Sequence, residues 1–153
     1  MFTTIVTPRF GDTDGLKHIN NVVIATWFEL GRNPIFRMFV PDLDLSHASW
    51  TLILAHTDYD FLGEIFYQYD VEIQTYVKRV GNKSFTTYQE AWQEGRLCAK
   101  GHATIVHYDF NNKITVEIPA NIKEKLNEHL LPDSAGISDN AVDFADVSCG
   151  DGK

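Results

Sequence analysis

Two aspartates, a histidine and two asparagines stand close together in the stretch Arg9-Phe-Gly-Asp-Thr-Asp-Gly-Leu-Lys-His-Ile-Asn-Asn21. Carboxylate and imidazole groups can move protons, so these residue types favour general acid–base chemistry. The apolar run that begins at Ile19 would leave Asp14 partly desolvated and poorly hydrated, which suits a base or a nucleophile. The alternative for Asp14 is a structural role, because Asp in a loop flanked by Gly often caps a turn.

Asp12 and Asp14 also form an Asp-x-Asp pair, which could hold a metal ion. No third ligand follows at a fixed spacing, so we expect Asp12 to pair with Arg9 or to cap the loop instead. The two cysteines, Cys98 and Cys149, cannot make a disulfide scaffold, and no Cys-x-x-Cys pair suggests zinc. We therefore expect no metal and no organic cofactor.

A long helix is predicted directly after this stretch, because nearly every residue from Ile19 to Val40 is apolar. Asn20 or Asn21 is the expected N-cap, and Pro34 predicts a kink, or a break near Gly31. The unpaired N–H groups and the positive dipole at such a helix start can polarise a carbonyl oxygen. A helix that is apolar on almost every side must be wrapped by other structure.

Strands account for most of the remaining chain. Residues 70–80 alternate between apolar and polar side chains, and strands are also expected at 2–7, 51–61, 83–93, 96–110 and 114–118. Pro119 could open a short helix that carries Ile122, Leu126, Leu130 and Leu131. This order predicts an α+β domain over residues 1–131, with a weakly ordered acidic tail at 132–153. Such a sheet leaves strand edges open, and edge-to-edge dimerisation would close them.

Composition excludes several functional classes. With 153 residues and 44% apolar side chains, the chain fits one globular domain. Its formal net charge of −8 works against unspecific binding to nucleic acid or to an anionic membrane, although a phosphate-bearing ligand needs only a local basic patch. No basic leader precedes an apolar segment, and no apolar run approaches a membrane span. We expect a soluble, cytoplasmic protein.

The stretch from Arg9 to Asn21, followed by Trp27-Phe-Glu29, resembles the signature of the 4-hydroxybenzoyl-CoA-thioesterase-like branch of the hotdog superfamily. Two later segments look like strands of that family, namely Val80-Gly-Asn-Lys-Ser-Phe85 and Lys100-Gly-His-Ala-Thr-Ile-Val106 followed by Asp109. The resemblance implies the hotdog fold, in which an antiparallel sheet wraps around one long central helix. It also implies hydrolysis of an acyl-CoA thioester to a free acid and CoA, with CoA as part of the substrate.

The resemblance assigns roles to two residues of the motif, and the residue types leave the roles of His18 and Glu29 open. Asp14 matches the carboxylate that acts as nucleophile or general base, and the backbone of Asn21 matches the oxyanion donor. His18 is a proton carrier, a hydrogen-bond donor to substrate or an ordinary structural residue. Glu29 could position the substrate, or it could be a surface or buried carboxylate with Arg32 as its partner.

The phosphates of CoA require basic contacts, for which Lys78, Arg79 and Lys83 are the candidates. The alternative is that these side chains are solvated at strand ends and guard against edge pairing. The aromatic residues of the helix, Trp27, Phe28, Phe36 and Phe39, are expected in the core.

Two other functions remain open on the sequence alone. A hotdog dehydratase acting on a 3-hydroxyacyl thioester would need a His beside an acidic partner on the helix, which His18 and Glu29 fit poorly. A non-catalytic acyl-thioester binding module is the other, because a Tyr common in the family is replaced here by Ile24. The carrier could be CoA or an acyl-carrier protein, and we expect a homodimer or a homotetramer.

Overall fold

The computed structural model describes residues 1–132, so the predicted tail falls outside the described residues from position 133 onward. The described elements follow the predicted order closely: β1 (Phe2–Val6), the 3₁₀ helix η1 (Phe10–Asp12), α1 (Asn21–Phe39), β2 (Leu52–Phe61), β3 (Val71–Val80), β4 (Ser84–Gln93), β5 (Arg96–Asp109), β6 (Ile114–Thr115) and α2 (Ala120–Asn127). In this described part of the chain, no helix is long and apolar enough to cross a membrane.

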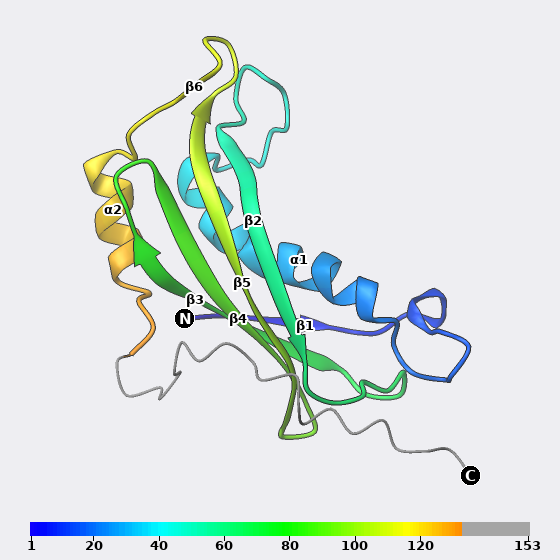
Figure 1. Cartoon of the computed structure of the whole chain (residues 1–153). Coiled ribbons are helices and arrows are strands. Elements are labelled where there is room, and N and C mark those ends of the chain that lie inside the picture. The colour runs from blue at the N-terminus through cyan, green and yellow to red at the C-terminus, as the bar shows by residue number, and fades with distance from the viewer. Residues whose placement is uncertain (133–153) are drawn as a thin grey trace.

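An antiparallel sheet curves around one side of α1, as Figure 1 shows. Its strands are ordered β1-β3-β4-β5-β2, and β6 pairs with β5 beyond this path. The alternation seen in the sequence of β3 is the reason for this packing, because its apolar side chains face the helix while the intervening polar ones face outward. The α+β arrangement expected from the hotdog resemblance is therefore present.

The core lies between α1 and the inner face of the sheet, in two clusters along the helix. Trp27 and Phe28 belong to one cluster, and Ile35 and Phe36 belong to the other. Each fully buried aromatic or aliphatic side chain of this kind contributes roughly 1.5–3 kcal/mol. The prediction that the helix aromatics are core residues is confirmed, although Phe39 is only partly buried.

One of the two alternatives predicted for α1 is excluded. The helix runs without interruption past Gly31 and Pro34, so it does not break there, and a kink at Pro34 stays a prediction. Pro34 removes the N–H that would bond to the carbonyl of Leu30, but Leu30 is 46% exposed, so water can satisfy that carbonyl. The sheet covers one side of α1, and a stripe that includes Leu30 and Val22 stays exposed within the described residues, Val22 at 72%.

The C-terminal helix α2 is shorter than the apolar spacing suggested. Ile122 and Leu126 are buried, as predicted, but Leu130 and Leu131 lie beyond the helix end. There the chain runs alongside β3 instead, since the N–H of Leu131 donates to the carbonyl of Val77 at 2.8 Å. Backbone pairing with an existing strand replaced the last helical turn.

Candidate active site

The motif between η1 and α1 folds into a small hairpin that ends at the first turn of the helix. The N–H of Asn20 donates to the carbonyl of Asp12 at 2.8 Å, and the N–H of Asp14 donates to the carbonyl of His18 at 2.8 Å. Thr13 and Ile19 form an antiparallel bridge between these two pairs. Asp14 is therefore only two residue pairs along the hairpin from Asn20, the residue before the helix, although Asn21, the first helical residue, is seven positions after Asp14 in the sequence.

Asp14 is half-buried and caps the tip of this hairpin. Its Oδ1 accepts the N–H of Leu16 at 2.8 Å and the N–H of His18 at 3.3 Å. The turn-capping role considered for Asp14 is thus present. One oxygen suffices for both bonds, so the cap does not compete with chemistry at the other oxygen.

The start of α1 supplies a backbone donor. Asn20 is the N-cap, and its side chain accepts the N–H of Val22 at 3.2 Å. The N–H of Val23 donates to the carbonyl of Asn20 at 3.0 Å. The N–H of Asn21 has no intrahelical acceptor, as expected for the first helical residue, and finds none elsewhere within residues 1–132. It can therefore receive an anionic oxygen.

Asp12 lies at the base of the hairpin and is only 4% exposed. Its carboxylate accepts the backbone N–H of Arg9 at 2.8 Å and a guanidinium N–H of Arg9 at 3.2 Å. Burial alone would raise the pKa of Asp12, but these hydrogen bonds and the charge of Arg9 outweigh it and hold the pKa below its ordinary value. The predicted pairing of Asp12 with Arg9 is confirmed.

His18 contacts a residue that the sequence did not single out. Its Nε2 lies 3.4 Å from a carboxylate oxygen of Glu64, and its ring meets the ring of Phe66 edge-on at 5.7 Å. Both partners lie in the segment that connects β2 to β3. The hairpin is held against this segment by a hydrogen bond from the Ile19 N–H to the Ile65 carbonyl. The His18–Glu29 pairing that a dehydratase would need is not what the fold brings together.

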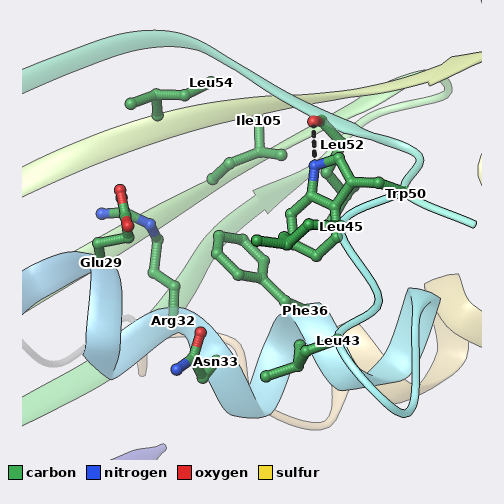
Figure 2. Close-up of a pocket in the computed structure, with 10 residues that line it drawn as sticks. All are labelled: Glu29, Arg32, Asn33, Phe36, Leu43, Leu45, Trp50, Leu52, Leu54 and Ile105. Carbon is green, nitrogen blue, oxygen red and sulfur yellow. Dashed lines mark hydrogen bonds between the residues drawn. The ribbon is translucent and has the colours of Figure 1, made fainter. Parts of the chain in front are cut away.

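A cavity of about 390 Å³ opens between α1, β2 and the segment that joins them (Figure 2). One face of α1 contributes polar groups at one end of the cavity, and apolar side chains from the joining segment, β2 and β5 form the rest of the wall. The lining residues are Glu29, Arg32, Asn33, Phe36, Leu43, Leu45, Trp50, Leu52, Leu54 and Ile105. Such a wall suits an apolar ligand with a polar attachment.

Arg32 is the unexpected member of this wall, because it is only 2% exposed. One guanidinium N–H donates to Oε1 of Gln89 at 3.0 Å, whereas its Nε has no hydrogen-bond partner within the described residues. Burial lowers the pKa of Arg32, and the charges of Tyr59 and Glu29 partly oppose this shift. The sequence suggested Arg32 as a partner for Glu29; the structure pairs it with Gln89 and leaves Glu29 exposed.

The three basic residues predicted to contact phosphate lie elsewhere. A bulge between Val77 and Arg79 places Lys78 and Arg79 on the outer face of the sheet, away from α1. There they line a shallow polar pocket together with His56, Asp58, Thr86, His102 and Thr104. Lys83 is exposed in the turn between β3 and β4. Within one protomer, the fold does not bring these side chains to the Asp14 hairpin.

The absence of a metal ion at the Asp-x-Asp pair stays a prediction. Over residues 1–132, no three His, Cys, Asp or Glu side chains gather as metal ligands would. The carboxylate of Asp12 accepts two hydrogen bonds from Arg9 instead.

Comparisons with known proteins identify the family. The model of the thioesterase-like superfamily matches residues 8–126. A predicted thioesterase from Bacillus stearothermophilus is 40% identical, with 85% of this chain and 96% of that one covered and a TM-score of 0.82. A thioesterase from Thermus thermophilus, complexed with coenzyme A and Zn, is 26% identical, over 82% and 96% of the two chains, with a TM-score of 0.72.

A thioesterase superfamily protein from Jannaschia sp. CCS1, 17% identical, shares the fold, with a TM-score of 0.75 over 86% of this chain and 94% of that one. No curated protein matches the sequence. The family match spans the hairpin, the central helix and all the long strands that follow. The chain is therefore a hotdog-fold member of the thioesterase-like superfamily.

Proposed function

We propose that this protein hydrolyses an acyl-CoA thioester to a free acid and CoA. The observation that carries the proposal is the hairpin, which holds the Asp14 carboxylate two rungs from the open N–H of Asn21 in a chain of the thioesterase-like superfamily. A base and an oxyanion donor at one place are the two groups that thioester hydrolysis requires.

In the proposed reaction, Asp14 takes a proton from water while the water oxygen attacks the thioester carbonyl carbon. The carbonyl oxygen becomes an oxyanion, which accepts the N–H of Asn21. The carbon–sulfur bond then breaks, the acid leaves, and the CoA thiolate receives the proton that Asp14 took. Alternatively, Asp14 attacks the carbonyl carbon directly and expels the CoA thiolate. Water then hydrolyses the resulting anhydride to the free acid and the Asp14 carboxylate, and the proton released by this hydrolysis goes to the thiolate. Hydrolysis in ¹⁸O-water under single-turnover conditions separates these routes, because only the anhydride route labels Asp14.

His18 is assigned to the same site as the group that carries the proton to the departing sulfur. Its backbone N–H already bonds to Asp14, which keeps the two residues adjacent. Glu64 restrains the ring at its Nε2. Imidazole is the side chain best suited to exchange a proton near neutral pH.

The cavity in Figure 2 is the proposed acyl pocket. A volume of about 390 Å³ lies near the lower end of the roughly 300–1,000 Å³ typical of small-molecule sites. Glu29 stands at its mouth and would position the substrate. Glu29 lies eight residues beyond Asn21, roughly 12 Å along the helix axis, so an acyl group bound at the hairpin of the same protomer reaches the cavity only if it is long.

A homodimer would shorten this path. β2 ends the sheet, with an edge unpaired within the described residues and exposed apolar side chains at Leu54 and Phe61. Antiparallel pairing of two β2 strands about a two-fold axis would place the partner subunit's hairpin beside this cavity. Light scattering tests the assembly: wild type should be a dimer or a higher oligomer, and Leu54→Lys should weaken it.

Lys78, Arg79 and Lys83 remain predicted phosphate contacts. Because they lie on the outer face or in a turn, they could reach a CoA bound at Asp14 only from another protomer. The Thermus thermophilus relative, complexed with coenzyme A, supports CoA as the carrier.

A thiol-release assay over aryl-, short-, medium- and long-chain acyl-CoAs tests the proposal. Turnover of at least one class is expected, and turnover of none would favour a non-catalytic binding module. A parallel incubation with a 3-hydroxyacyl-CoA, followed by the absorbance of the enoyl product, covers the dehydratase alternative.

A further inference from the structure

Phe10 is the most exposed large apolar side chain of the described residues, at 80%. It opens η1, directly before the hairpin that holds Asp14. Its ring meets the ring of Tyr67, itself 45% exposed, edge-on at 6.4 Å. Large apolar side chains that stay exposed in this way lose the benefit of burial, and contiguous patches of them mark binding surfaces.

Two basic residues lie close to Phe10 in sequence, in a chain whose net charge is −8. The side chain of Arg9 is 80% exposed, and only one of its N–H groups is used at 3.2 Å by Asp12. A guanidinium carries five donors, so the others can face an anion. Lys17 is exposed at the hairpin tip. The carboxylates nearby are Asp12, which Arg9 neutralises, and Asp14 and Glu64, which belong to the proposed site.

Aromatic rings beside a guanidinium match the chemistry of a nucleotide. Purine bases stack on exposed aromatic side chains, and arginine binds phosphate through paired N–H groups. CoA carries an adenine, a diphosphate and a ribose phosphate at the end opposite its thiol, whereas an acyl-carrier protein presents no such nucleotide. An adenine site at the aromatic pair would distinguish between the two carriers that the sequence left open.

Chain geometry allows this arrangement. Phe10 and Asp14 are four residues apart, which is at most roughly 13 Å even for a fully extended chain. The phosphopantetheine arm of CoA is longer than this when extended, so a nucleotide at Phe10 leaves the thioester free to reach Asp14. The same site would hold both ends of one substrate.

We propose that Phe10 and Tyr67, with Arg9 and Lys17, bind the adenine nucleotide of CoA, so that the enzyme prefers acyl-CoA to other acyl thioesters. This inference rests on the proposed thioesterase function. In this proposal the nucleotide of CoA binds beside the hairpin. Binding of the nucleotide through Lys78 and Arg79, on the outer face of the sheet, is the competing arrangement.

The test compares kcat/KM for an acyl-CoA with that for the acyl-pantetheine carrying the same acyl group. Phe10→Ala should lower the value for acyl-CoA roughly tenfold or more, as expected for the loss of a base stack, and leave acyl-pantetheine within about twofold. Tyr69→Ala is the control, because it removes another exposed aromatic ring from the segment that carries Tyr67 without touching the pair.

A second readout does not depend on turnover. Calorimetry with adenosine 3′,5′-bisphosphate should show binding to wild type and to Tyr69→Ala but at least tenfold weaker binding to Phe10→Ala. Equal kcat/KM values for the two thioesters in wild type would overturn the nucleotide site while leaving the thioesterase function intact. Loss of nucleotide binding in Lys78→Ala/Arg79→Ala, but not in Phe10→Ala, would overturn it too. If neither thioester is hydrolysed but the nucleotide still binds, the thioesterase function is refuted and the nucleotide site stands.

Discussion

Replacing Asp14 by asparagine separates the two roles that the structure allows for this residue. Oδ1 of Asp14 accepts two backbone N–H groups, from Leu16 and from His18. An asparagine keeps an oxygen at that position, so the hairpin cap survives and the free energy of unfolding should change by no more than about 0.5 kcal/mol. The amide cannot take a proton from water, so the chemical function alone is removed.

The size of the effect follows from that loss. General-base assistance contributes on the order of 10²–10⁴-fold, which corresponds to about 2.7–5.4 kcal/mol of transition-state stabilisation. We expect kcat for the best acyl-CoA substrate to fall by that factor in Asp14→Asn. The KM should change little, because the pocket and the proposed nucleotide contacts remain.

Asp109→Asn is the matched control. Oδ1 of Asp109 also accepts two backbone N–H groups of its own turn, from Asn111 at 2.9 Å and from Asn112 at 3.0 Å. Oδ2 of Asp109 also accepts an N–H of the Asn112 side chain at 2.7 Å, a bond that the variant loses. The variant makes the same chemical change in a turn far along the chain and should keep full activity. If Asp14→Asn unfolds at the wild-type temperature yet retains more than a tenth of kcat, the assignment of Asp14 is refuted.

Three further variants test the scaffold around this site. Asp12→Asn should destabilise the protein at neutral pH, because folding lowers the pKa of Asp12 below its ordinary value of 3.8. The stabilisation from the Asp12 charge is present above pH 3.8 and disappears as the pH falls through the folded pKa. Urea titrations of variant and wild type should therefore converge in acid. Asn20→Ala should cost about 1 kcal/mol through the lost cap to Val22, measured by thermal unfolding, while the Asn21 N–H stays in place. Gly31→Ala should cost about 1–3 kcal/mol in urea unfolding, since an ideal Cβ would lie 2.8 Å from a methyl carbon of Ile73; wild-type stability would show that the strands can move aside.

Local patterns in the sequence were sufficient for the elements of the fold and for the motif. The alternation in β3 and the apolar run of α1 are local consequences of strand and helix geometry, so a reader of the sequence can find them. The pairing of Asp12 with Arg9 was predictable for the same reason, because three residues separate them within one turn.

Only the tertiary structure decided which distant residues meet. Glu64 reaches His18, and Gln89 reaches the buried Arg32, because the sheet folds segments far apart in sequence against the hairpin and the helix. The bulge after Val77 likewise turned Arg79 outward beside Lys78, an effect that a strict two-residue period cannot foresee. The sequence determined the chemistry available at Asp14 and Asn21. The hairpin that holds them together depends on backbone pairing, which residue types do not reveal.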